Sequence, residues 1–336
     1  MNHANLPTES FFKSKKKAPD EQEHMSHQYR AWRDHISRCI EDFLSADHSY
    51  ALLHTSSMVG LFSCIFVKTS IRGRIKQVHA SEIKRGMGGL HGNKVRTLLL
   101  CRVDSKPSDF LFFQGALVIR MILDDSSVCM VNCHLAAGQT QTLSRHADIA
   151  AILESICLPQ AASNYTPGTF VGGGDGSMIL DHEISILNGD LNYRIDAMPR
   201  DTVVRAVKER NLTKLLERDQ LLVSRRKNMG FRLRFFQEMP ITFAPTYKYN
   251  VGTDDYDSSE KKRAPAWCDR VLYKGVGRIK GEEYRRWEVR VSDHRPVSAR
   301  LRMRIKKVNE QKRKQVWKGM ERDFQLYRDK VAADTK

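Results

Sequence analysis

Carboxylate, amide and imidazole side chains gather in a few short segments of this chain. The first segment, Gly189-Asp190-Leu191-Asn192, follows the apolar run 184–187. Asp190 and Asn192 stand two positions apart, so on a strand their side chains project to the same side. There they could hold and deprotonate a water while a metal draws charge from a phosphate. An ordinary Asp/Asn turn that ends a strand is the alternative explanation.

Two histidines stand at similar places. Ser292 to Pro296 reads SDHRP and comes just before an alternating strand-like segment, while His134 ends the apolar run that begins at Val128. Imidazole can bind a phosphoryl oxygen, and a neighbouring carboxylate can orient the ring or contact a metal. A surface turn at the first place and a structural histidine at the second are the alternatives.

A longer block combines basic and aromatic residues. It consists of PTYKY (245–249), SEKKR (259–263) and PAWCDR (265–270). Lysine and arginine interleaved with Tyr and Trp suit the recognition of phosphate groups, which arginine can contact through two hydrogen bonds at once. A solvated basic loop with one packed Trp is the alternative.

The composition favours a globular protein with an acidic partner. Of 336 residues, 41% are hydrophobic and 28% charged, enough for one large layered α/β domain or two small ones. The 56 Lys and Arg against 39 Asp and Glu leave a formal charge of +17. That excess suits nucleic acid, an anionic membrane surface or a polyphosphorylated molecule.

Cysteine usage and the absence of long apolar segments predict a cytoplasmic protein. The seven cysteines form no CxxC pair, and several lie in apolar runs, where a reduced Cys acts as a small hydrophobic residue. No run approaches the roughly 18 apolar residues of a membrane span, and the N-terminus lacks the apolar core of a signal peptide.

Alternating strands and helices must position these clusters. Ser26 could cap a helix that presents apolar residues on one face as far as Phe43. The predicted strands are 58–67, 128–135, 183–191 and 297–305, and the predicted helices include 200–226 and a basic terminal helix at 309–330. This alternation predicts a layered α/β domain.

The order of the clusters resembles one known family. His134-Leu135, Gly189 to Asn192, the basic and aromatic block and Ser292 to Pro296 together resemble the inositol polyphosphate 5-phosphatases of the endonuclease/exonuclease/phosphatase superfamily. The resemblance covers about 26–304 and looks closest to large fungal and plant members with N-terminal WD repeats. It implies a DNase-like, four-layered α/β/β/α sandwich. It also implies Mg²⁺-assisted hydrolysis of the 5-phosphate of a phosphoinositide or inositol polyphosphate, without a phosphoenzyme.

The resemblance also implies a role for each matching residue. Asp190 would activate the attacking water, and Asn192 would lie beside the scissile phosphate. His294 and His134 would bind that phosphate, Asp269 would position the catalytic histidine, and Asp293 would lie in the shell of the metal. The implied substrate-binding residues are Asn93, Lys94, Tyr247, Lys248, Lys261, Arg263 and Arg270.

The first departure from the family concerns the metal. In the family, two strands upstream of the first helix supply an Asn and a Gln-Glu whose carboxylate is the principal Mg²⁺ ligand. Here 25 residues precede Ser26, and the Gln22-Glu23 pair follows the polar segment 18–21, which cannot form a buried strand. We therefore expect the sandwich to lack its first strands and the metal to lack its principal Glu ligand, which would weaken binding.

The second departure is an interruption. The family reads GNKGA without a break, whereas here Lys94 is followed by Val95 and the pattern resumes at Gly115-Ala116. We interpret 95–114 as an insertion, either unspliced intron sequence or a lineage-specific loop. The expected layout is a polar tail or loop at 1–25, a 5-phosphatase-like catalytic domain at 26–305 and a basic C-terminal helix at 306–336.

Three functions compete at this point. The leading one is 5-phosphate hydrolysis at a peripheral anionic membrane surface. The basic stretch 300–328 could lean on that surface, with a solvated helix face as the alternative explanation of the stretch. A catalytically impaired fragment that binds phosphoinositide or membrane is the second. A nuclease of the same superfamily would suit the positive charge, but it gives the basic and aromatic block no role, so no nucleic acid is expected. The sequence sets neither the preference for lipid or soluble substrate nor the oligomeric state.

Overall fold

The computed structural model describes residues 26–44, 49–58, 60–85, 114–161 and 168–334. The predicted tail at 1–25, nearly all of the predicted insertion at 95–114, and both Asn93 and Lys94 lie outside these residues. The helices are α1 (His27–Phe43), α2 (Thr69–Arg72), α3 (Thr142–Leu153), α4 (Arg200–Lys208), α5 (Leu212–Leu216), α6 (Gln220–Lys227) and α7 (Glu310–Asp334), with 3₁₀ turns η3 (Ile179–Asp181) and η4 (Arg232–Phe235). The strands are β1 (Tyr50–Met58), β2 (Leu61–Lys68), β3 (Ile75–Arg85), β4 (Gln114–Leu123), β5 (Ser126–His134), β6 (Ile184–Asp190), β7 (Asp269–Lys274), β8 (Ile279–Arg286) and β9 (Val297–Met303).

A five-stranded sheet of order β3-β4-β5-β6-β7 forms the centre of the domain. Strands β5 and β6 run parallel, and the other neighbours pair antiparallel. Residues 115–122 of β4 are buried on both faces, as expected of a strand covered by layers above and below. The parallel pair matters most for function, because it brings the C-terminal ends of β5 and β6 to one edge.

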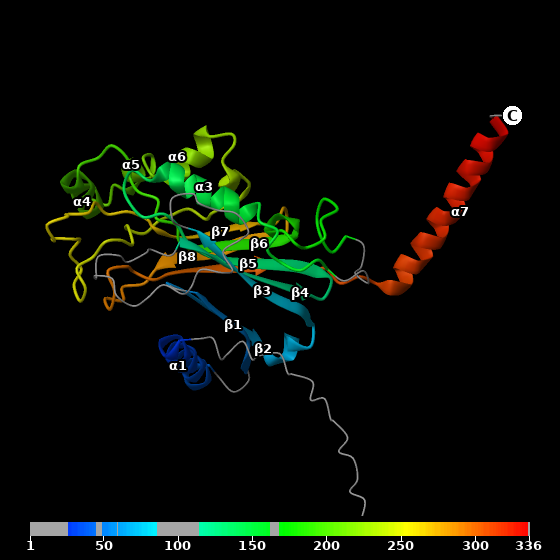
Figure 1. The fold of residues 1–336 in the computed structure, drawn as a ribbon, viewed down its shortest axis with the longest axis horizontal. Coiled ribbons are helices and arrows are strands. Elements are labelled where there is room, and N and C mark those ends of the chain that lie inside the picture. The colour runs from blue at the N-terminus through cyan, green and yellow to red at the C-terminus, as the bar shows by residue number, and fades with distance from the viewer. Residues whose placement is uncertain (1–25, 45–48, 59, 86–113, 162–167, 335–336) are drawn as a thin grey trace, which may run out of the picture.

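The layers stack in the expected order. Figure 1 shows the helices α3 to α6 over one face of the central sheet, β1 and β2 on the opposite face, and α1 beyond them. Apolar residues of β1, β2, β8 and β9 (Leu53, Ile65, Ile279, Met303) pack against the same central core of Met121, Val128 and Ile184. The α/β/β/α sandwich is thereby confirmed. Within the described residues, its second β layer consists of two separate two-stranded sheets, β1-β2 and β8-β9.

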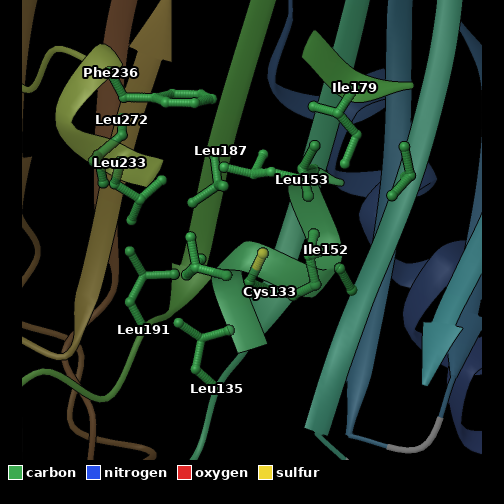
Figure 2. Packing of buried hydrophobic residues seen from close by; sticks show 14 of the residues in the cluster. Cys133, Leu135, Ile152, Leu153, Ile179, Leu187, Leu191, Leu233, Phe236 and Leu272 are labelled. Carbon is green, nitrogen blue, oxygen red and sulfur yellow. The ribbon is translucent and has the colours of Figure 1, made fainter. Parts of the chain in front are cut away.

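The largest core lies between the central sheet and the helices. Figure 2 shows Leu187, Leu191 and Leu272 from the sheet side meeting Ile152 and Leu153 of α3, all of them fully buried. Burying an apolar side chain of this size contributes about 1.5–3 kcal/mol relative to exposure. This core fixes the strand ends from which the candidate site projects.

The predicted helix at Ser26 is confirmed, and the Ser26 side chain accepts a hydrogen bond from the Tyr29 amide. The prediction of one strand at 58–67 is wrong, because the chain turns at Gly60 (φ 79°) and the segment divides between β1 and β2. The single helix predicted at 200–226 is also wrong. It breaks at Arg210 (φ 56°), and Asp219 caps a separate helix, α6.

The predicted terminal helix is confirmed as α7, which has no buried residue and extends away from the layered body in Figure 1. Among the described residues, none of the helices combines the length and apolarity that crossing a bilayer demands.

Candidate active site

The candidate site lies at one edge of the central sheet, where three strands bring polar residues into register. His134 is paired with Asp190 across the parallel β5-β6 ladder, and Asp190 is paired with Asp269 at the start of β7. His134 Nε2 lies 3.8 Å from Asp190 Oδ2. The three residues lie on adjacent strands of a rigid sheet, so the hydrogen-bonded pairing of the strands sets the spacing between their side chains.

The turn after β6 depends on two unusual backbone conformations. Gly189 has φ 125°, and a Cβ there would lie 2.1 Å from the Cys133 carbonyl oxygen, so only glycine fits. Asn192 has φ 56°, which Asn tolerates better than most residues. Its amide N–H donates to Asp190 Oδ1 over 2.9 Å, and its side-chain Nδ2 donates to the Leu135 carbonyl. The turn therefore holds Asp190 and Asn192 side by side.

His294 reaches the same place from the loop before β9. Its Nδ1 lies 2.9 Å from Asp269 Oδ2, which also accepts a 2.7 Å hydrogen bond from the Thr246 hydroxyl. Because Asp269 engages Nδ1, the other ring nitrogen, Nε2, is left to face a ligand. The predicted positioning of the catalytic histidine by Asp269 thus has the expected geometry.

The pKa values of Asp190 and His294 both lie above their ordinary values. Burial raises the pKa of the Asp190 carboxyl, and the negative charge of Asp269 raises it further. Burial lowers the pKa of His294, but the hydrogen bond to Asp269 and the charges of Asp269 and Asp190 outweigh burial. The raised pKa of His294 favours its positively charged imidazolium, and the raised pKa of Asp190 makes its carboxylate a stronger base.

Arg194 is a site residue to which the sequence interpretation gave no role. Its Nε donates to the Asn192 carbonyl over 3.1 Å, and its guanidinium lies 4.4 Å from the centroid of the Tyr247 ring. The Tyr247 ring in turn contacts His294, with 4.7 Å between ring centroids. The spacing Asp190, Asn192, Arg194 could have indicated it, since these polar residues alternate with Leu191 and Tyr193.

Lys248 and Asp293 form an ion pair beside His294, whose neighbour in the chain is Asp293. Burial acts to raise the pKa of Asp293, but the hydrogen bond from Lys248 and the charge of His294 prevail and lower it. The structure therefore brings Tyr247, Lys248 and Asp293 to the site, as expected. However, the carboxylate of Asp293, which was predicted to bind the metal, is already paired with the ammonium of Lys248.

Gln220 supports this site from the helical side, and the sequence interpretation also missed it. Its Oε1 accepts hydrogen bonds from Arg145 (2.6 Å) and the Arg194 amide (2.9 Å). Its Nε2 donates to the Gln139 carbonyl (2.9 Å) and to Asp196. The buried carboxamide thus uses its full hydrogen-bonding capacity to join the segments after β5 and β6.

The prediction that Arg270 binds substrate is wrong. Its side chain is fully buried and makes a bidentate ion pair with Glu238, at 2.7 and 2.8 Å. It also lies 3.0 Å from Asp219, which caps α6 and is fully buried as well. Position 270 follows Asp269 on β7 and so projects to the opposite side of the strand, away from the site.

Lys261 and Arg263 stay predictions. Lys261 is exposed and Arg263 half-buried, on the loop that leads to Ala266. The Arg263 amide donates to Asp257 over 2.9 Å, which fixes the course of the loop but not the direction of the guanidinium.

The described residues do not complete a metal site. In the described part of the chain, no group of three or more His, Cys, Asp or Glu side chains is arranged to hold a metal ion. Asp269 is bonded to His294 and Thr246, and Asp293 is bonded to Lys248. Of the three carboxylates, Asp190 therefore keeps the most capacity to act as a metal ligand. Mg²⁺ usually requires one or two well-placed carboxylates with open positions. These residues alone therefore do not fit a Mg²⁺ shell.

Comparison with known proteins supports the interpretation of this edge. Residues 6–300 match the model of endonuclease/exonuclease/phosphatase family 2. The chain is 44% identical over 314 residues to a probable inositol polyphosphate 5-phosphatase of Schizosaccharomyces pombe, covering 93% of this chain and 24% of that protein. It is 33% identical over 285 residues to inositol-1,4,5-trisphosphate 5-phosphatase 1 of the same organism, covering 85% and 23%. The chain thus spans about a quarter of the length of these relatives.

A solved structure resembles most of the fold. The inositol polyphosphate 5-phosphatase domain of SPsynaptojanin, in complex with inositol (1,4)-bisphosphate and calcium ion, superposes with a TM-score of 0.72 at 30% identity. The match covers 89% of this chain and 76% of that domain.

Proposed function

Because the chain belongs to the endonuclease/exonuclease/phosphatase family, and within it to the inositol polyphosphate 5-phosphatases, we propose that it hydrolyses the 5-phosphate of an inositol polyphosphate or phosphoinositide. The observation that carries the proposal is that His134, Asp190 and Asp269 lie side by side on adjacent strands, with His294 hydrogen-bonded to Asp269. These residues provide a base and a cationic hydrogen-bond donor at one edge of the sheet.

In the proposed reaction, Asp190 accepts a proton from a water that attacks the phosphorus. The raised pKa of Asp190 strengthens it as a base, because a carboxylate with a higher pKa holds the transferred proton better. Nε2 of the protonated His294 donates a hydrogen bond to the phosphoryl group while the P–O bond to inositol breaks. His134, opposite Asp190, donates to the same group. The inositol oxygen leaves with a proton from solvent or from one of these imidazoles.

In this proposal Asn192, Arg194 and Tyr247 hold the reacting groups in position. Asn192 is 3% exposed and fixed by hydrogen bonds through its amide and its side chain, so its position changes little as charge develops. Lys248 would exchange its partner Asp293 for a substrate phosphate, since an ammonium gains more from a dianion than from one carboxylate.

We include Mg²⁺ in the proposal as the cation that the reaction requires. The calcium ion in the similar 5-phosphatase domain supports a divalent cation there. Since the described residues do not complete a shell, no step above passes through the ion. Chelation tests this part separately: EDTA should abolish phosphate release and added Mg²⁺ should restore it, whereas release that persists in EDTA would contradict the requirement.

The test of the reaction is phosphate release from inositol 1,4,5-trisphosphate by the purified chain, with chromatographic identification of the inositol 1,4-bisphosphate product. Asp190→Ala should reduce the rate by about 10²–10⁴. Asp201→Ala is the matched control, because Asp201 is 91% exposed and pairs only with neighbouring Arg200 in the described structure. Release of a different phosphate, or equal loss in both variants, would refute the proposal.

Two further assays on the same purified chain test the alternative functions, a catalytically impaired fragment and a nuclease. A folded chain that binds vesicles containing phosphatidylinositol 4,5-bisphosphate and releases no phosphate would support binding without catalysis. Cleavage of a single-stranded oligonucleotide at a comparable rate would favour the nuclease. We also propose that the basic stretch 300–328 attracts the enzyme to anionic membranes in the cytoplasm. This predicts faster hydrolysis of the lipid in anionic than in neutral vesicles.

A further inference from the structure

Helix α7 carries a stripe of large apolar side chains that are exposed to solvent. Trp317, Met320, Phe324, Tyr327 and Val331 are between 46% and 65% exposed. The helix has no buried residue and extends away from the layered body (Figure 1). Monomeric proteins seldom leave a contiguous row of large apolar side chains in water, so this apolar stripe indicates a binding surface.

The spacing of the apolar stripe indicates what binds it. Its members follow one another at intervals of three, four, three and four residues, which is the a/d pattern of a coiled coil. The pattern therefore fits a second helix with the same repeat.

Charges beside the apolar stripe favour a second copy of this chain. With Trp317 and Phe324 at a positions, Asp323 occupies g and Arg328 the following e. In a parallel pair of helices, a g residue faces the next e residue of the partner. Asp323 would therefore face the partner subunit's Arg328, and symmetry would repeat this attractive pair on the other side.

The borders of the stripe carry charges of both signs. Glu321 and Arg328, at e, and Asp323 and Lys330, at g, flank it on its two sides. A helix that buries its apolar face in anionic lipid carries Lys and Arg along both borders, so these mixed borders favour a helical partner over insertion of the stripe into a membrane.

We propose that α7 pairs in parallel with α7 of a second copy along residues 317–331, so that the chain forms a homodimer held outside its catalytic body. The stripe spans little more than two heptads, and coiled coils of this length are weak. The dimer should therefore have a Kd in the micromolar range and dissociate on dilution. The proposal does not depend on the proposed function, since its test measures mass and not activity.

The test is sedimentation equilibrium of the full chain over a dilution series from about 100 µM downwards, a range that brackets a micromolar Kd. The 38.6-kDa chain should approach twice its monomer mass at the upper end. Phe324→Glu should yield monomer at every concentration, with circular dichroism checking that the helix content is kept.

Charge reversal tests the pairing itself. Asp323→Arg and Arg328→Asp should each raise the Kd about tenfold, because two attractive pairs become two repulsive ones. The double variant should return the Kd to near the wild-type value. Arg322→Asp, at an outward f position with the same charge change as Arg328→Asp, is the matched control and should leave the Kd unchanged.

Three outcomes would overturn the proposal. One is a wild-type chain that stays monomeric across the series. Another is a dimer that Phe324→Glu leaves intact, because its interface would then lie elsewhere. The third is a dimer on which the single charge reversals have no effect, or whose affinity the double variant fails to restore, which would exclude the parallel arrangement.

Discussion

Replacing Arg270 with methionine should destabilise the fold without acting directly on substrate. The Arg270 guanidinium holds two buried carboxylates, Glu238 through two hydrogen bonds and Asp219 through a contact of 3.0 Å. Methionine fills similar volume but leaves both carboxylates without their cation. Removing one member of a buried ion network costs about 3–5 kcal/mol, because the remaining charges stay desolvated.

This cost translates into a measurable shift in melting temperature. An unfolding entropy of about 2.1 cal/mol/K per residue over 336 residues gives about 0.7 kcal/mol/K. A loss of about 4 kcal/mol should therefore lower Tm by about 6 °C, measured by calorimetry alongside urea unfolding. Arg232→Met is the matched control. Its partner Glu154 is 49% exposed, so breaking that pair should cost under about 1 kcal/mol.

The destabilisation should also depend on pH. Burial raises the pKa of Asp219 even with Arg270 present, and the charge of Arg270 is the main influence that opposes burial. Without Arg270, the native state should bind a proton at Asp219 that the unfolded state releases. A carboxyl whose folded pKa is raised loses stability as pH rises through the range between its unfolded and folded pKa values. Arg270→Met should accordingly cost more at pH 8 than at pH 5.

Two results would refute this reasoning. If Arg270→Met melted within about 1 °C of wild type while KM rose more than tenfold, Arg270 would be a substrate ligand after all. If its cost were the same at pH 5 and pH 8, the buried carboxylate would not be the origin of the penalty. Adding Asp219→Asn to the variant should recover about 1 kcal/mol or more.

Three further predictions concern the site. Asp269→Asn should move both the acidic and the basic limb of the profile of rate against pH to lower pH. The substitution removes the charge of Asp269, which raises the pKa of Asp190 and, as its hydrogen-bond partner, the pKa of His294. A slower enzyme with unmoved limbs would contradict this. Gly189→Ala should cost about 2 kcal/mol or more, measured by urea unfolding, since its Cβ would meet a backbone oxygen at 2.1 Å; a stability equal to that of wild type would show that the turn can relax. Gln220→Glu should cost about 1–3 kcal/mol, since a carboxylate cannot donate the two hydrogen bonds from Nε2; an unchanged Tm would mean that the carboxamide supports nothing.

The local sequence determined the family and indicated most residues of the candidate site. Asp190 ends the apolar strand β6, so its place at the sheet edge follows from the sequence. Asn192 lies in the turn beyond the strand, and that turn holds it beside Asp190. His134 ends a second such strand, so the parallel pairing of β5 and β6 could only bring the two ends together. A short motif at a strand end keeps its meaning because the strand direction fixes where its side chains point.

Tertiary structure decided which charged residues serve the fold and which serve the site. Asp269 and Arg270 are neighbours in one motif, yet one bonds to His294 and the other lies fully buried against Asp219 and Glu238. The sequence could not separate them, since burial depends on the layer that covers each side of β7. The support from Gln220 was hidden for the same reason. Its partners lie as far as 81 residues away in the chain, and only the packed layers bring them within hydrogen-bonding distance.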